Sequence, residues 1–348
     1  MHRYDFPSAE TDFQEYPGQT AMKNEEKLLH WADEKEVISS NRPVKFLLLL
    51  LVHVPTCLVL LLIYPVSFFY LICSKRARTE ARLYQKQLKE FTHGKSPRVI
   101  SPFLQILSFS LCVLEKIVGW LGKVTYDKLV CHDDDLPELI QMLEKKQGAV
   151  LIGSHLGNIE LLRSLFSFNR TGVSREVPIS VIMELKSTEQ FNKTIREVNP
   201  KAGFNVIDPK SIGPDTMIAL DEQVKNGGLV VFTADRTSAN VRTRSVRLPF
   251  LGKEADFPYG VFLLTVLLNA PTYFVFALRT KTSTLNPRYN IFVERARTSL
   301  SCTRSERDGC IRSLCREFVE KLEKYCREFP YQWYNFYNFW LLSDNKGA

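Results

Sequence analysis

The chain has 348 residues, of which 45% are hydrophobic and 24% are charged. This composition excludes a disordered chain and predicts a sizeable hydrophobic core. The formal net charge of +8 favours an acidic partner, such as a phospholipid surface, a nucleic acid or an acidic carrier protein, and does not by itself choose among them.

The first 73 residues divide into a polar part and an apolar part. Residues 1–45 form a polar N-terminal segment, and the run FLLLLLVHVPTCLVLLLIYPVSFFYLIC at 46–73 carries no charged side chain apart from a possible charge on His53. If helical, this run is about 42 Å long, whereas the hydrocarbon core of a bilayer is about 30 Å thick. It therefore predicts a membrane-anchoring helix, spanning or in-plane. A buried hairpin of a soluble domain is the alternative.

The charges on either side of the apolar run indicate its orientation. Residues 1–45 contain six Lys or Arg against nine Asp or Glu, whereas residues 74–100 contain eight against two. Because basic flanks remain in the cytosol, the large C-terminal part is predicted to face the cytosol. A second apolar stretch at 103–124 keeps several polar residues, which is typical of a helix on the bilayer surface or packed against the main domain. Residues 46–125 are thus expected to form an anchoring region.

From residue 126 to residue 348 the pattern predicts an α/β domain. Continuous apolar strands that alternate with helical segments are typical of a central, mostly parallel or mixed sheet flanked by helices. The expected strands are 148–154, 178–184, 228–234, 272–279 and 289–296, and the expected helices are 159–168, 187–197, 214–226, 258–269 and 303–328.

The stretch AVLIGSHLGNIELLRSL at 149–165 carries a candidate catalytic pair. Two residues five apart on one helix point about 140° away from each other. His155 and Glu160 can meet if His155 follows the strand, Gly157 makes the turn and Asn158 caps a helix beginning at Ile159. Glu160 would then hold one imidazole nitrogen and leave the other free as a general base. The alternative is a buried histidine bonded to a backbone carbonyl, because His-x4-Glu alone is a weak pattern.

Several further blocks, in order along the chain, resemble one known family. These blocks are SHLGNIELLR, the ADRTSANVRTRSVRLPFLGKEADFPYG region, VERA, PYQWYNFYNFW and the membrane-flanking YPVSFFYLICSKRARTEARLYQKQL. Together they are similar to the lysophospholipid acyltransferase superfamily. The resemblance is strongest to the branch that contains the lipid A late acyltransferases and their predicted bacterial relatives. It covers roughly residues 42–342.

The resemblance implies a role for each matching residue. His155 is expected to be the general base and Glu160 the carboxylate that orients it, and Arg236 is expected to clamp a substrate phosphate or carboxylate. An internal structural network of Asp235 and Arg236 is the alternative for that pair. Phe250, Leu251 and Phe257 are candidates for lining an acyl groove, and core packing is the alternative for them. The expected substrate-binding residues are Gly157, Asn158, Arg163, Asp235, Arg236 and Phe257.

This sequence also departs from the family pattern. The relatives tend to have Gly before the Asp-Arg pair and Pro two residues after it, where this chain has Ala234 and Ser238, and Val261 stands in place of a usual Pro. These departures put in doubt the shape of the substrate-facing loop at 235–247, and therefore the acceptor.

The expected activity is transfer of a fatty acyl group from an acyl carrier protein or acyl-CoA thioester to a hydroxyl or amine of a membrane lipid or glycolipid. The resemblance implies a bacterial inner membrane with the catalytic domain facing the cytosol. No metal, nucleotide cofactor or nucleic-acid partner is expected, because the chain has no P-loop and no G-x-G-x-x-G, and its basic residues cluster beside the apolar run. The alternatives are a non-catalytic lipid-binding or assembly protein of the same fold and an acyl-thioester hydrolase.

Overall fold

The computed structural model describes residues 54, 56–120, 128–132, 135–159, 161, 173–183, 205–237, 244–281 and 287–340. The segment 1–45, Glu160 and Arg163 therefore lie outside the described residues, as do the expected helix at 187–197 and, apart from its first residues, the one at 159–168.

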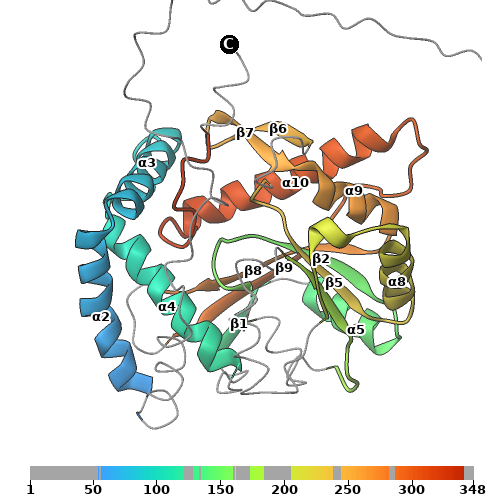
Figure 1. Ribbon diagram of the computed structural model, residues 1–348, viewed down its shortest axis with the longest axis horizontal. Coiled ribbons are helices and arrows are strands. Elements are labelled where there is room, and N and C mark those ends of the chain that lie inside the picture. Colours follow the sequence, from blue (N-terminus) through green and yellow to red (C-terminus); the bar gives the residue numbers. More distant parts are fainter. Residues whose placement is uncertain are drawn as a thin grey trace, which may run out of the picture.

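A seven-stranded sheet forms the centre of the protein, in the order β1-β9-β8-β2-β5-β3-β4 (Figure 1). β8 and β9 pair antiparallel, and the other neighbouring strands pair parallel. The sheet is therefore mixed, as expected. Its strands are β1 (Leu129–Cys131), β2 (Ala149–Gly153), β3 (Ile179–Ile182), β4 (Asn205–Ile207), β5 (Leu229–Thr233), β8 (Thr272–Arg279) and β9 (Tyr289–Arg295).

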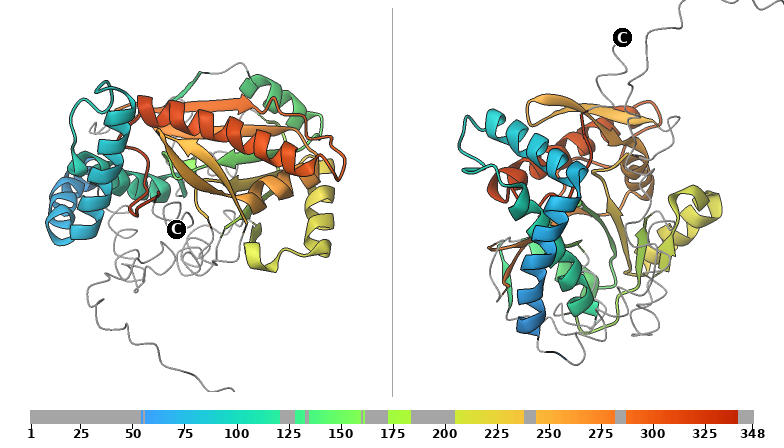
Figure 2. Two further views of the ribbon diagram at one scale, coloured as in Figure 1. Left: turned by 90° about the horizontal axis from the view of Figure 1, so that it is seen from above. Right: turned by 60° about the vertical axis from the view of Figure 1, so that its left-hand side comes forward.

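Helices cover both faces of this sheet. One core layer joins the sheet to α8 (Pro214–Lys225), α9 (Tyr259–Leu268) and α10 (Arg307–Glu328). The other joins it to α5 (Asp135–Glu144), and Figure 2 shows α10 and α5 on opposite sides of the sheet. Successive side chains of β2 enter opposite layers, because a strand alternates its faces: Val150 belongs to the first layer and Leu151 to the second. A strand buried on both faces needs the continuous apolar sequence that β2 has.

The α/β fold predicted from the sequence is confirmed. The five expected strands correspond to β2, β3, β5, β8 and β9, and the helices expected at 214–226, 258–269 and 303–328 correspond to α8, α9 and α10. The short strands β1 and β4 were not predicted, nor was the antiparallel hairpin of β6 (Ser245–Phe250) and β7 (Lys253–Pro258). Each has too few residues or too polar a pattern to show a clear period.

The β6–β7 hairpin carries the aromatic residues that were candidates for an acyl groove. Phe250, Leu251 and Phe257 are fully buried. The rings of Phe250 and Phe257 lie 5.9 Å apart, and both contact Phe339 at 5.6 Å. The structure thus places them in the core, which is the alternative that the sequence left open.

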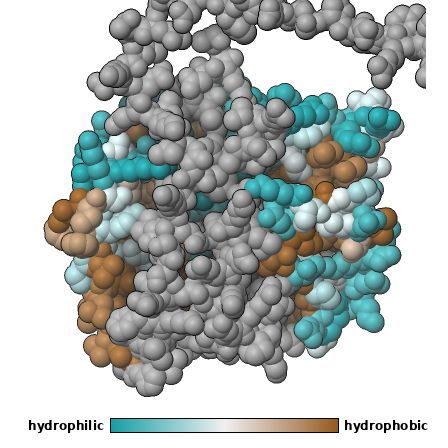
Figure 3. Space-filling model, in the orientation of Figure 1, coloured by the Kyte–Doolittle hydropathy of each residue, from teal (hydrophilic) through white to brown (hydrophobic). Residues whose placement is uncertain are grey.

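The N-terminal helices pack beside the sheet domain as a separate layer (Figure 1). α2 (Thr56–Cys73) lies along α4 (Pro102–Trp120), with Val59 of α2 in a small core with Leu107 and Leu111 of α4. The other face of α2 is solvent-exposed and apolar, and Figure 3 shows this strip at the edge of the molecule. Its large side chains, each between 51% and 68% exposed, are Leu58, Leu61, Leu62, Val66, Phe68, Phe69 and Ile72.

Among the described residues, one helix segment is long and apolar enough to cross a bilayer, Pro102–Gly119 of α4. It is 56% buried inside the protein. Of the two expectations for the second apolar stretch, the structure therefore favours a helix packed against the main domain. The described part of the first apolar run, α2, instead leaves its apolar face uncovered.

α3 (Lys75–Phe91) and α4 connect this layer to the sheet domain. Gln87 donates to the carbonyl of Leu251 at 2.8 Å, and Gln105 donates to the carbonyl of Trp333 at 2.7 Å. A buried ion pair joins Glu115 of α4 to Arg279 of β8 at 2.9 Å, with side chains 6% and 3% exposed. Removing one partner of such a pair leaves an uncompensated buried charge.

We therefore expect Glu115→Ala to lower the free energy of unfolding by about 3 to 5 kcal/mol. Denaturant unfolding in maltoside detergent measures this loss, and Glu320→Ala, which removes an exposed carboxylate from α10, is the control. Equal midpoints for the two variants would mean that the ion pair does not hold α4 to the sheet.

Candidate active site

The candidate active site lies where β2 and β5 end. These strands are parallel neighbours, and their register pairs Gly153 with Thr233. His155 and Asp235 each follow two residues after their strand, so the register carries them to the same place. The carboxyl ends of neighbouring strands are the usual position of ligand sites in open α/β sheets.

Asp235 holds His155 through two bonds. The imidazole Nδ1 lies 2.8 Å from Oδ1 of Asp235, and the backbone N–H of His155 donates to Oδ2 at 2.9 Å. The indole Nε1–H of Trp333 donates to the same Oδ2 at 2.9 Å. The carboxylate thus fixes both the main chain and the ring of His155.

These contacts determine the ionisation of Asp235. The side chain is fully buried, and burial on its own raises the pKa of Asp235. The charge and hydrogen bond of His155, the charge of Arg236 and the Trp333 bond outweigh that effect, and the pKa lies below its usual value. An ionised carboxylate only accepts hydrogen bonds, so Nδ1 of the imidazole carries a hydrogen and the lone pair of the neutral ring is on Nε2.

His155 itself is arranged as a base. Burial, and then the positive charge of Arg236, lower the pKa of His155, although Asp235 acts in the opposite direction. The imidazole is therefore largely neutral at pH 7. Its side chain is 32% exposed, and Nδ1 is the ring nitrogen that the buried Asp235 holds.

The turn after His155 requires glycine at position 157. Gly157 has φ +76°, and a Cβ there would lie 2.3 Å from the carbonyl oxygen of Ala277. Its N–H donates to the carbonyl of Gln332 at 2.9 Å, and the N–H of Asn158 donates to that of Ala277 at 2.8 Å. The expected turn at Gly157 is present, with Ile159 and Leu161 in helical conformation after it.

Asn158 differs from the expectation that its side chain caps this helix. Its backbone carbonyl accepts from Leu161, but both polar atoms of its side-chain amide are buried and have no hydrogen-bond partner among the residues that the structure describes. A buried amide normally has partners. The sequence pattern thus predicted that Asn158 belongs to the turn, but it did not predict that the side-chain amide of Asn158 is buried.

Residues 332–334, which we call the C-terminal strap, hold the turn from the other side. Leu156 and Trp333 form an antiparallel bridge, and the N–H of Tyr334 donates to the carbonyl of His155 at 3.0 Å. Gln332 donates to the carbonyl of Arg279 and accepts from its N–H, at 2.6 and 2.8 Å. The sequence identified the aromatic C-terminal block only through the family resemblance and did not place its indole on Asp235.

Arg236 is also connected to the strap. Its guanidinium donates to the carbonyl of Tyr334 at 2.9 Å, so at least part of the side chain has a structural role. Of the residues expected at the site, the structure brings together His155, Gly157, Asn158, Asp235 and Arg236. Phe257 lies in the core, and Glu160 and Arg163 lie outside the described residues. The expected hydrogen bond from Glu160 to His155 thus stays a prediction.

A family model described as bacterial lipid A biosynthesis acyltransferase matches residues 125–342, more than half of the chain. The chain belongs to this family. The match confirms the resemblance found in the sequence, and it contains the turn after β2, the strand end at Asp235 and the C-terminal strap. Membership supports acyl transfer to a lipid acceptor. No curated protein matches the chain.

Trp333 offers a test of the site geometry. Trp333→Phe keeps an aromatic ring but removes the N–H that donates to Asp235, and a buried carboxylate that loses a partner costs about 1 to 3 kcal/mol. We expect acyl transfer to fall about tenfold or more, with the KM for the lipid little changed.

Trp340→Phe is the matched control, because the indole of Trp340 is also buried and donates to a carbonyl, that of Phe250 at 3.3 Å. Rates of acyl transfer and thermal midpoints for both variants separate positioning from stability. An equal effect of the two substitutions on the rate would contradict a positioning role for Trp333.

Proposed function

We propose that this protein is a membrane-bound acyltransferase in which Nε2 of His155 is the general base. The observation that carries the proposal is the ionised, buried Asp235 on Nδ1 of a part-exposed imidazole, in a chain of an acyltransferase family. This pairing fixes the tautomer that a base needs and stabilises the imidazolium that forms when the base accepts a proton.

The proposed reaction is a direct transfer from a thioester. Nε2 takes the proton of the acceptor hydroxyl or amine as its oxygen or nitrogen attacks the thioester carbonyl carbon. A carbon–oxygen or carbon–nitrogen bond forms, the carbon–sulfur bond breaks, and the imidazolium returns the proton to the leaving thiolate. An acyl-enzyme is not required. Ser154 is buried and its oxygen accepts from the N–H of Leu156 at 3.1 Å, which disfavours it as a nucleophile.

The tetrahedral intermediate needs a donor for its oxyanion. The backbone N–H groups of residues 155–158 all donate elsewhere. The side-chain amide of Asn158 is buried and has no partner within the described part of the chain, so we propose Asn158 as an oxyanion or substrate donor. Glu160 and Arg163 remain proposed site residues, with Glu160 as a second carboxylate near the imidazole, and Arg236 remains a proposed substrate contact.

We further propose that the protein works on the cytosolic side of a bacterial inner membrane. The exposed apolar strip of α2 suits insertion into the hydrocarbon region. α3 begins directly after Ser74, and its exposed cations include Lys75, Arg82 and Lys86, which suits anionic headgroups next to that strip. The donor is an acyl carrier protein or acyl-CoA, since both are anionic, and the acceptor is a lipid or glycolipid.

Loss of the imidazole tests the proposal directly. Membranes containing His155→Ala should transfer labelled acyl groups from a carrier-protein thioester to lipid at least 10²-fold more slowly than membranes with the intact protein. His132→Ala, which removes an exposed histidine that is hydrogen-bonded to Asn290, should keep its activity. Free labelled fatty acid in place of labelled lipid would indicate a hydrolase. Identical lipid products from the intact protein and from His155→Ala would indicate a non-catalytic lipid-binding protein.

The pH dependence tests how His155 is tuned. A base acts when neutral, so kcat/KM should rise with pH through the pKa of His155, which lies below the ordinary value of about 6.5. Arg236→Gln removes a positive charge that lowers this pKa, so the acidic limb should move to higher pH. Asp235→Asn removes a charge that raises it, so the limb should move to lower pH.

Substitution of Asp235 and of Glu160 shows which of the two carboxylates orients His155, because the orienting one has the larger effect on the rate. Asp235→Asn also loses the acceptor that fixes the tautomer, so kcat should fall roughly 10²- to 10⁴-fold. If Glu160→Gln shows the larger fall and Asp235→Asn little change, then Glu160 is the orienting carboxylate. An acidic limb that stays in place in Arg236→Gln would contradict the electrostatic role of Arg236.

A further inference from the structure

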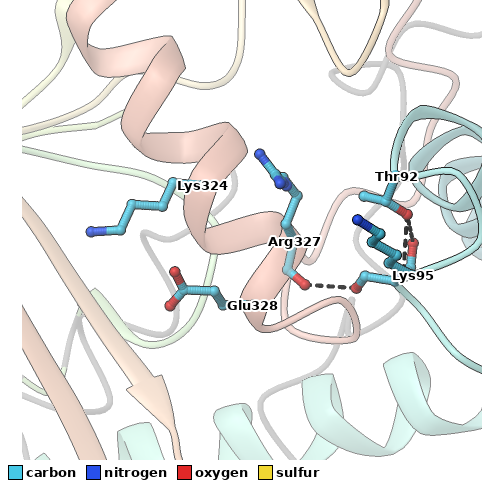
Figure 4. A pocket seen from close by; sticks show the side chains of 6 residues that line it. Thr92, Lys95, Lys324, Arg327 and Glu328 are labelled. Atoms are coloured by element: carbon cyan, nitrogen blue, oxygen red, sulfur yellow. Dashed lines mark hydrogen bonds between the residues drawn. The ribbon is translucent and has the colours of Figure 1, made fainter.

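A second candidate site lies between the end of α3 and the end of α10. It is a pocket of about 400 Å³, within the size range of small-molecule sites. The loop after α3 forms one wall and the last turn of α10 the other (Figure 4). The lining residues are Thr92, Lys95, Ser96, Lys324, Arg327 and Glu328.

The charges of this pocket are unevenly compensated. Lys324 lies 3.5 Å from the carboxylate of Glu294 and over the ring of Tyr325 at 4.6 Å. Lys95 and Arg327 form no ion pair with any residue that the structure describes. In Figure 4 their side chains stand between the two walls, whereas Lys324 and Glu328 point to the other side of α10. Two cations from different elements thus border the same space. The one acid in the lining, Glu328, points away from them in Figure 4, and Arg327 also acts electrostatically on Glu323 of the same helix.

The usual role of a last-turn cation does not explain both of them. Arg327 lies in the last turn of α10, where a positive charge offsets the negative end of the helix dipole. Lys95 belongs to no helix. Ser96 donates to the carbonyl of Arg327 at 2.6 Å, and Thr92 accepts from the N–H of Ser96 at 2.9 Å. These bonds join the two walls and hold the loop that carries Lys95 against α10.

We propose that this pocket binds a phosphate group, as a monoester or diester, between Lys95 and Arg327. A phosphate presents several acceptor oxygens, and a guanidinium from one wall and an ammonium from the other bind different oxygens of the same group. The volume leaves room for an attached headgroup. None of the pocket residues bonds to His155 or Asp235, so the site is separate from the one proposed for catalysis, and its test does not depend on that proposal.

The test measures binding of inorganic phosphate to the full chain in maltoside detergent by phosphorus NMR. Lys95→Gln/Arg327→Gln is compared with Lys253→Gln/Arg316→Gln, which removes two exposed cations outside the pocket. We expect the dissociation constant for phosphate to rise about tenfold or more in the pocket variant and to stay unchanged in the control. Circular dichroism and the thermal midpoint establish that both variants fold.

Vesicles then identify the source of the phosphate. Intact protein and both variants are floated with phosphatidylcholine vesicles that contain or lack phosphatidylglycerol. If only the pocket variant loses the preference for phosphatidylglycerol, the ligand is a lipid headgroup, and if it keeps that preference while losing phosphate, the ligand is a soluble phosphate ester. The proposal is overturned if the intact protein does not bind phosphate, or if the pocket variant binds it as tightly as the intact protein.

Discussion

The buried carboxylate of Asp235 is the constraint on which the site depends. A fully buried charge is costly unless hydrogen bonds compensate it, and here the donors are the N–H and Nδ1 of His155 and the indole of Trp333. They come from segments that are far apart in the chain: the turn after β2 and the C-terminal strap. Satisfying one carboxylate therefore requires the turn, the end of β5 and the strap to be in place together, and the same contacts leave Nε2 as the basic nitrogen.

The strap explains how a flexible turn keeps a fixed geometry. Each backbone N–H from His155 to Asn158 donates to Asp235, to Ser154, to the strap or to β8, and α4 contacts the same structure from outside. Gln105 bonds the carbonyl of Trp333, Ser108 lies 2.9 Å from the hydroxyl of Tyr334, and Cys112 lies 3.7 Å from the carbonyl of Gly157. Two of the polar residues that interrupt the second apolar stretch of the sequence, Gln105 and Ser108, thus join it to the strap.

The sequence predicted the fold class, the five long strands, the helices α8, α9 and α10, and His155 as a candidate base, because these depend on local periodicity and on a recognisable block. It did not predict that Asp235 holds His155. Both residues were expected at strand ends, but their contact depends on β2 and β5 being neighbours with Gly153 opposite Thr233, and strand order is a long-range property. The partner of Trp333 is missed for the same reason, since a period shows which face is buried and not what lies against it. For Phe257 the sequence left the choice between an acyl groove and the core open.

The same packing relates the site to the proposed membrane surface. One side of α4 packs against α2, whose opposite face is apolar and exposed, and another contacts the strap, while Glu115 fixes α4 to β8. A bilayer that accepts the α2 strip would therefore hold His155 at a set height through α4. For an acceptor whose reactive group is confined to the headgroup region, this matters more than a tight binding pocket, because the membrane already restricts the acceptor to a layer and the protein needs only to place its base at that level.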